Sequence, residues 1–347
     1  MLTIGVDGDG AKGRMTVGVG TRWMEEAVAT DQILVLLMDG GCIIFAMDND
    51  TVLAIDIGGS KISCGIVDDT GTILTSGNVV TPHSDDPEAV FAVLDELSRN
   101  VLSQVGADLM PIACGVGSVG PMTAGGRTVS PLNISPWRDF PLLSRLQEVV
   151  QIPTFVDNDA KALALGEGWI GGARGEANYI SMVVSTGIGG GIVLDGRLLD
   201  GNDGNAGHIG HVIVVPDGRQ CSCGSFGCLE AEASGSAIQA TTGRHPREAS
   251  DQVVDRTGTL VGLGVASVMN LLDLRLCTIA GSVALGYGDR FFSAANRELA
   301  QRSHMSYTSG AIIRPCGLGS KGPLIGASAV GWRGIGRLGD MPGNVQA

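Results

Sequence analysis

The chain has 347 residues, of which 44% are hydrophobic and 17% are charged, so it is long enough and apolar enough to bury a sizeable core. The length predicts two domains. The formal net charge of −13 repels phosphate backbones, and we therefore expect no nucleic-acid partner. The N-terminus lacks the pattern of a secretory signal, so we expect a cytoplasmic protein with no membrane partner.

The first 50 residues differ from the rest of the chain. They are acidic, and they contain two apolar runs, Ile33–Met38 and Cys42–Met47, separated by Asp39-Gly40-Gly41. Each run is far too short to span a bilayer, and the break between them predicts a hairpin turn. We expect residues 1–50 to be an N-terminal extension outside the main fold.

From Val52 onward the pattern becomes regular. The segments Val52–Ile55, Ile62–Val67 and Thr72–Thr75 predict three strands joined by tight turns, which form an antiparallel meander. A helix is expected at Pro87, because capping residues and a proline precede apolar residues at helical spacing. The run Pro111–Val116 predicts a further strand.

The second half of the chain repeats this theme. A strand at Tyr179–Ser185, a glycine turn at Thr186–Gly191 and a strand at Ile192–Leu194 are expected. The unit of strand, glycine loop and strand therefore occurs twice, at 52–67 and at 179–194. Two similar halves predict a two-lobed α/β protein with a cleft between the lobes.

We place the lobe boundaries as follows. Residues 51–157 form a small α/β lobe, which a C-terminal helix at about 322–340 joins. Residues 158–321 form a large α/β lobe, and it contains a loop at 207–230 that is rich in cysteine and histidine.

That loop carries a set of metal ligands. His211 precedes Cys221, Cys223 and Cys228, and one imidazole with three thiolates completes a tetrahedral zinc site that leaves no position for water. The alternative is a disulfide with one spare thiol. Nothing else indicates an oxidising compartment, because the other cysteines stand singly among apolar residues. We therefore favour structural zinc.

The two glycine loops are candidates for binding phosphate, because few side chains block access to their backbone N–H groups. Neither has the spacing of a P-loop or of a dinucleotide fingerprint, and each alone is typical of a hairpin turn. As a pair facing one cleft they favour a nucleotide, with Asp56 placed to hold Mg²⁺ directly or through water. Lys61 either neutralises phosphate or is simply solvated. The candidates are Asp56, Gly58, Gly59, Ser60, Lys61, Thr186, Gly187 and Gly189.

A strand end followed by a helix places Asn158 beside Asp159. Asp and Asn are common helix caps, which is one interpretation. The other is that Asp159 is a general base that takes a proton from a sugar hydroxyl as it attacks phosphorus. His208, His211 and Glu230 at the edge of the zinc loop offer hydrogen-bonding groups suited to hydroxyls.

Several of these segments occur together in one order along the chain, and the ordered set resembles the ROK family of bacterial sugar kinases and sugar-responsive repressors. The resemblance extends from about Val52 to about Arg333. The segments are Asp56-Ile57-Gly58-Gly59-Ser60-Lys61, Asn158-Asp159-Ala160, Ser185-Thr186-Gly187-Ile188-Gly189-Gly190-Gly191, Gly210-His211 and Cys221-x-Cys223-Gly224-x-x-Gly227-Cys228-x-Glu230.

The resemblance implies the two-lobed, actin-like (ribonuclease H-like) ATPase fold, with a structural zinc loop. ATP with Mg²⁺ would lie in the cleft on the two glycine loops, and Gly281 and Ser282 would contact the adenosine. Asp159 would be the catalytic base. The residues that would bind sugar are Asn158, His211, Glu230, Gly120 and Asn133.

His208 departs from the glutamate that many family members carry in Glu-x-Gly-His. The form Gly207-His208-Ile209-Gly210-His211 is similar to the N-acetylmannosamine kinases of the family. A histidine accepts at most one hydrogen bond, whereas a glutamate accepts several, so His208 favours a ring with an acylamino group at its 2-position.

We therefore expect an ATP-dependent kinase of the 6-hydroxyl of a hexose or N-acylhexosamine, with N-acetylmannosamine favoured. The alternatives are a glucokinase of the same family, a sugar-binding ROK repressor and a homologue that only binds its ligand. An acidic N-terminus without amphipathic helices disfavours the repressor. Polyphosphate stays open as the donor, and a homodimer or homotetramer is expected.

Overall fold

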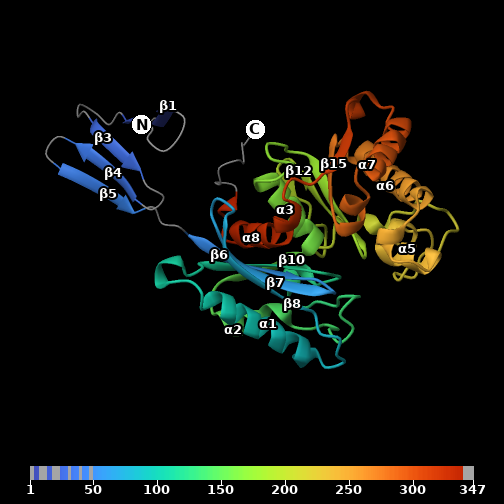
Figure 1. Cartoon of the computed structure of the whole chain (residues 1–347), viewed down its shortest axis with the longest axis horizontal. Helices are drawn as coiled ribbons and strands as arrows, with labels where there is room; N and C mark the ends of the chain where they lie inside the picture. Colours follow the sequence, from blue (N-terminus) through green and yellow to red (C-terminus); the bar gives the residue numbers. More distant parts are fainter. Residues whose placement is uncertain are drawn as a thin grey trace. The chain divides into compact units, whose positions relative to one another are not determined.

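The computed structural model describes residues 50–338 and, before them, the backbone of five short strands. The chain divides into two compact units, Met1–Asp50 and Thr51–Ala347 (Figure 1). In the first unit, the strand pairs are antiparallel, and β4 pairs with β5, as the expected hairpin requires; the turn at Asp39-Gly40 lies outside the described residues. Its strands are β1 (Ile4–Asp7), β2 (Arg14–Val17), β3 (Met24–Ala29), β4 (Ile33–Met38) and β5 (Gly41–Ala46).

The second unit contains two five-stranded sheets. The sheet of the small lobe has the order β8-β7-β6-β9-β10, with antiparallel pairs as far as β6 and parallel pairs after it. Its strands are β6 (Thr51–Ile57), β7 (Lys61–Asp68), β8 (Ile73–Val80), β9 (Ala113–Ser118) and β10 (Thr154–Asn158).

The sheet of the large lobe repeats this topology. Its order is β13-β12-β11-β14-β15. The pairs from β13 to β11 are antiparallel, and the pairs from β11 to β15 are parallel. Its strands are β11 (Tyr179–Val184), β12 (Ile188–Leu194), β13 (Arg197–Leu198), β14 (Leu276–Ala280) and β15 (Ile312–Pro315). The predicted internal repeat and the two-lobed, actin-like fold are confirmed.

Helices lie on both faces of each sheet. On the small lobe, α1 and α2 contact one face and α8 the other, while α3 lies against β11 and β12 of the large lobe and α7 against its opposite face (Figure 1). The described helices longer than one turn are α1 (Pro87–Leu102), α2 (Leu142–Val150), α3 (Asp159–Trp169), α4 (Leu229–Ala233), α5 (Gly235–Thr242), α6 (Asp251–Leu272), α7 (Ser282–Arg302) and α8 (Gly322–Gly334).

The two lobes meet where α3 crosses α8. A Cβ on Gly326 of α8 would lie 2.7 Å from the carbonyl oxygen of Ala162 in α3, and a Cβ on Gly166 would lie 3.1 Å from the Cα of Gly326. Only glycine fits at such distances, so the two backbones pack directly on each other.

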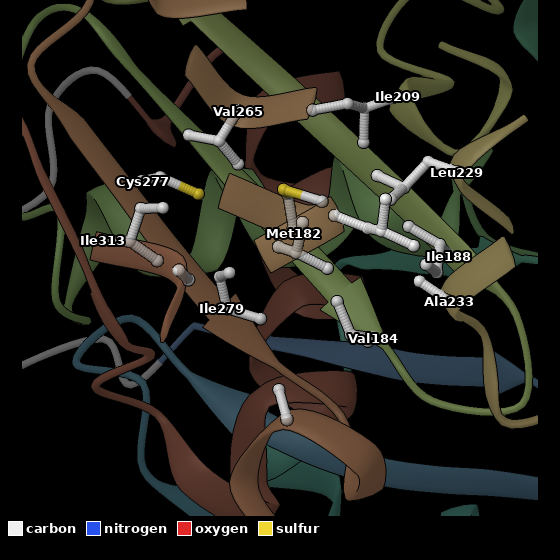
Figure 2. Packing of buried hydrophobic residues seen from close by; sticks show 14 of the residues in the cluster. Met182, Val184, Ile188, Ile209, Leu229, Ala233, Val265, Cys277, Ile279 and Ile313 are labelled. Carbon is white, nitrogen blue, oxygen red and sulfur yellow. The ribbon is translucent and has the colours of Figure 1, made fainter. Parts of the chain in front are cut away.

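The core of the large lobe fills the space between its sheet and α6. Figure 2 shows Met182 and Ile279 from the sheet facing Val265 from α6, with Leu229 of α4 beside them. All four are buried, and each contributes roughly 1.5–3 kcal/mol relative to an exposed position. This core fixes the strand ends that carry the site.

Three sequence expectations were wrong in extent. The C-terminal helix, expected to extend to about residue 340, is α8, and it ends at Gly334. The third strand continues to Val80, because β8 is an edge strand whose side chains alternate between partly buried and exposed. The glycine turn of the second half ends at Gly187, and the three following glycines, Gly189 to Gly191, belong to strand β12. A Cβ on Gly191 would lie 2.7 Å from the Cβ of Ala164, so these glycines admit α3 against the strand. No described helix is long and apolar enough to cross a membrane.

Candidate active site

The N-terminus of α3 brings a cap and a carboxylate together. The Asn158 side-chain oxygen accepts hydrogen bonds from the backbone N–H groups of Ala160, at 3.0 Å, and Lys161, at 3.4 Å. The cap interpretation of Asn158 is therefore confirmed. The side-chain nitrogen of Asn158 stays available, and it lies 3.4 Å from the point where Gly120 would carry a Cβ.

Asp159 lies across a glycine from Asp56, at the end of β6. A Cβ on Gly117 would lie 3.5 Å from the Cα of Asp159 and 3.8 Å from an oxygen of Asp56. Burial raises the pKa of both carboxyls. Burial and then repulsion by Asp159 bring the pKa of Asp56 to about 7, although Lys61 acts in the opposite direction. A buried carboxylate whose charge is destabilised by a neighbouring carboxylate suits a divalent cation.

The first glycine loop is held from two sides. The Thr81 hydroxyl donates to the carbonyl of Gly58 at 2.7 Å, and the Thr81 N–H donates to the carbonyl of Ser60 at 3.1 Å. Gly59 packs on Asn133 so closely that a Cβ there would lie 2.5 Å from the Cβ of Asn133. Both residues line a hollow of about 260 Å³. The predicted site residues Gly59 and Asn133 are thus neighbours.

Glu230 connects the zinc loop to the second glycine loop. Its carboxylate accepts a hydrogen bond of 2.8 Å from the backbone N–H of Ile188, and a Cβ on Gly187 would lie 2.8 Å from the same oxygen. One carboxylate oxygen is therefore engaged by the loop, and the other is left for a ligand.

The zinc ligands predicted from the sequence lie together. The ligand atoms of His211, Cys221, Cys223 and Cys228 all fall within 4.8 Å of one another. The Cys221 sulfur is 3.7 Å from Nδ1 of His211, and the Cys223 and Cys228 sulfurs are 3.8 Å apart. The edge of a tetrahedron with Zn–S bonds of about 2.3 Å is also about 3.8 Å, so the four residues fit zinc.

The disulfide alternative does not fit this geometry. All three cysteines of the loop are free, and the separation of Cys223 and Cys228 is far above the S–S bond length of about 2.05 Å. Zinc itself stays a prediction.

His208 lies beside the same glycine as Asn158. Its Nε2 is 3.7 Å from the point where Gly120 would carry a Cβ, and its ring centroid is 6.1 Å from that of His211. Burial lowers the pKa of His208 below its ordinary value of 6.5. The imidazole is therefore neutral at physiological pH, with one donor and one acceptor.

A cavity of about 240 Å³ opens beside the second glycine loop, at the N-termini of two helices. At the start of α5, the Ser236 N–H donates a hydrogen bond of 3.1 Å to the carbonyl of Thr186, which connects the helix to the glycine loop. At the start of α7, the Ser282 and Ser185 hydroxyl oxygens are 3.0 Å apart. The start of α7 has no side-chain cap, and helix N-termini attract anions, so a phosphate chain suits this cavity.

The residues that line the cavity and escaped the sequence analysis include Gln239, His245, Arg247 and Tyr287. His245 and Arg247 follow α5 in a short loop, where the sequence offers no motif to single them out. The predicted residues Thr186 and Ser282 line the same cavity.

Three further predicted residues, Lys61, Gly189 and Gly281, lie near the site. Lys61 is exposed at the start of β7, close enough to Asp56 to lower its pKa. Gly189 lies within β12 against α3, where a Cβ would be 3.0 Å from the Cβ of Ala160. Gly281 has a φ of 102° at the cap of α7 and approaches the carbonyl of Val184, which excludes a side chain.

Known proteins resemble this chain over most of the second unit. A glucokinase from Streptomyces coelicolor is 36% identical over 212 residues, which are 61% of this chain and 64% of that protein, so the match spans just under two thirds of its length. An N-acetylmannosamine kinase from Yersinia pseudotuberculosis is 33% identical over 260 residues, which are 70% of this chain and 87% of that protein.

A solved structure resembles it as well. The ROK family glucokinase from Streptomyces griseus, in complex with glucose and AMPPNP, is 27% identical and superposes with a TM-score of 0.71 over 82% of this chain and 99% of that chain. The sequence profile of the ROK family matches residues 52–332. The chain therefore belongs to the ROK family.

Proposed function

We propose that this protein is an ATP-dependent sugar kinase that phosphorylates the 6-hydroxyl of a hexose or N-acylhexosamine. The observation that carries the proposal is the pair of enclosed carboxylates, Asp159 and Asp56, between the first glycine loop and the capped start of α3. Sequence relatives named glucokinase and N-acetylmannosamine kinase support the same class of reaction.

In this proposal, each carboxylate has a separate role. The Asp159 carboxylate accepts the proton of the sugar 6-hydroxyl while its oxygen attacks the γ-phosphorus of ATP, and ADP leaves. The raised pKa of Asp159 brings it closer to neutral pH, which suits a general base. Mg²⁺ held by Asp56 would neutralise charge on the phosphates. The N-terminus of α7 at the nucleotide cavity stabilises the phosphate chain.

For the sugar, we propose N-acetylmannosamine, because a neutral His208 beside Gly120 offers one donor and one acceptor near the ring. An amide substituent supplies both complementary groups. Glucose is the second candidate, and the relatives named glucokinase favour it.

A coupled ADP-release assay tests the function. Purified protein is given ATP and Mg²⁺ with N-acetylmannosamine, N-acetylglucosamine, glucose or mannose, and the phosphorylated position is assigned by NMR. We expect turnover that depends on sugar and yields the 6-phosphate, with the highest kcat/KM for N-acetylmannosamine. Highest kcat/KM for glucose would select the second candidate. No turnover with any sugar, with ATP or with polyphosphate, would refute the kinase.

A further inference from the structure

The segment between β13 and His208 leaves the large-lobe sheet, contacts the small lobe and returns to β12. Three of its glycines, Gly201, Gly204 and Gly207, have φ values of 73°, 84° and 98°, so the backbone is tightly curled. The Ala206 N–H closes the curl with a hydrogen bond of 3.0 Å to the carbonyl of Asp200. We call residues 199–207 the tethered segment. Its next residue is His208.

One tether is a buried lysine. The Lys161 side chain is 1% exposed, and its Nζ lies 2.9 Å from an oxygen of Asp157, 2.9 Å from an oxygen of Asp200 and 2.9 Å from the carbonyl of Gly204. All three ammonium hydrogens therefore have acceptors, two of them in the tethered segment. Lys161 also follows Asp159 by two residues on α3, so the start of this helix holds the segment.

A second tether crosses between the lobes. The Asn205 side-chain nitrogen donates to the carbonyl of Met122 at 2.9 Å, and its side-chain oxygen accepts from the Met122 N–H at 3.4 Å. One amide side chain thus engages both polar groups of one backbone residue in the small lobe. Met122 follows Gly120 by two residues, and Gly120 lies beside His208.

The end of the segment is fixed on the large lobe. A Cβ on Gly207 would lie 2.5 Å from the carbonyl oxygen of Gly190 in β12, so the backbone rests directly on the strand. With this contact the path of the chain into His208 is set by Lys161, by Asn205 and by β12. Arg333 of α8 adds an ion pair of 2.7 Å to Asp200 in the same segment.

We propose that Lys161 and Asn205 are positioning residues for sugar recognition, which act by holding His208 against Gly120 and Asn158. The proposal rests on the proposed kinase function. Neither side chain takes part in the proton or phosphoryl transfer. Their loss displaces a ligand group, and a shift of about 1 Å at such a group weakens recognition strongly. The effect therefore falls on the sugar and on the choice between sugars, and it leaves ATP binding unchanged.

The principal test is Asn205→Ala, which removes both hydrogen bonds to Met122, and one of 3.2 Å to the carbonyl of Asp203, from a partly exposed position. The matched control is Asn178→Ala. The Asn178 side chain accepts a backbone hydrogen bond of 2.9 Å from Asp195, at the opposite end of the β11–β12 hairpin from Ile188. Both variants lose a polar contact of the same kind, and only one lies at the site.

For Asn205→Ala we expect the KM for the preferred sugar to rise about tenfold and the preference between N-acetylmannosamine and glucose to change. The KM for ATP should stay within about twofold, and Asn178→Ala should match the wild type in all three quantities. Lys161→Met should also raise the KM for sugar and leave the KM for ATP unchanged, and its increase in sugar KM should be larger. Should that variant fail to fold, Asn205→Ala alone decides the matter.

The outcomes separate the two proposals. A wild-type protein without turnover on any sugar overturns the kinase function before any variant is made. An active wild type with unchanged sugar KM and unchanged preference in Asn205→Ala overturns the positioning role and leaves the kinase standing. Equal increases in the KM values of sugar and ATP also overturn it, because they indicate a general structural loss.

Discussion

The Glu230 carboxylate accepts a hydrogen bond of 2.8 Å from the backbone N–H of Ile188, across 42 residues of chain. Glu230 follows the last cysteine of the zinc loop by two residues, and Ile188 follows the turn of the second glycine loop. A group proposed to bind sugar is thus bonded directly to a loop proposed to bind phosphate.

Two substitutions at Glu230 separate these roles. In Glu230→Gln the side-chain oxygen still accepts a hydrogen bond from the Ile188 N–H. We therefore expect a higher KM for the sugar and an unchanged KM for ATP. In Glu230→Ala the loop loses its acceptor, and a buried N–H without a partner costs about 1–3 kcal/mol. The KM values of both substrates should then rise. Steady-state kinetics with each substrate varied in turn measures this, and an unchanged ATP KM in Glu230→Ala would contradict the coupling.

The histidine and cysteine cluster predicts about one zinc ion per chain. Cys223→Ser removes one thiolate, so zinc content should fall well below half and the melting temperature should drop. Cys316→Ser is the control, since Cys316 lies outside the cluster. Elemental analysis and thermal denaturation check this. Wild-type protein without zinc, or Cys223→Ser with full zinc, would refute the metal site.

Glu232 forms hydrogen bonds that stabilise the zinc loop, and its ionisation makes the free energy of unfolding depend on pH. It accepts hydrogen bonds of 2.7 Å from the Arg219 N–H and 2.6 Å from the Arg256 side chain. Burial opposes its ionisation, but these bonds outweigh burial and lower its pKa below the ordinary value of 4.5. The stabilisation is therefore complete above about pH 4.5 and is lost as the pH falls through the lower, folded-state pKa.

Glu232→Gln should accordingly be less stable than the wild type by about 2 kcal/mol at pH 7. The difference should shrink as the pH falls below about 4.5. Urea denaturation across this range measures it, with the exposed Glu248→Gln as control. A difference that is the same at pH 7 and at pH 3.5 would show that the charge is not responsible.

The crossing of α3 and α8 admits no added atoms. Gly326→Ala would place a Cβ 2.7 Å from a backbone oxygen of Ala162, which cannot move aside easily, and we expect a loss of about 1–3 kcal/mol. Gly286→Ala is the control, because a Cβ there meets nothing within 4 Å, and alanine favours the helix by about 1 kcal/mol. Denaturation without nucleotide compares them. Equal stabilities for the two variants would contradict the close crossing.

Local signals in the sequence predicted much of this fold. The proline that follows the capping residues starts α1, and Asn158 caps α3. Each of these features depends on the conformation of a few neighbouring residues, so the local sequence predicts it directly. The cysteine cluster is equally local, because its spacing confines the ligands to one loop.

Features that depend on distant packing were not predictable. The glycines of β12 were mistaken for a turn, because their cause is α3, whose approach is decided by the whole lobe. The partners of Lys161 include Asp200, 39 residues away, and no pattern in the sequence connects them. His245 and Arg247 line the nucleotide cavity through the placement of a loop that carries no motif.

The most direct test of the central claim is Asp159→Asn, measured for sugar binding by isothermal titration calorimetry and for turnover by ADP release. The change keeps the size of the side chain and removes its ability to accept a proton. The account predicts sugar affinity within about threefold of the wild type and turnover lower by about 10²–10⁴. Turnover close to that of the wild type would contradict the assignment of Asp159 as the base.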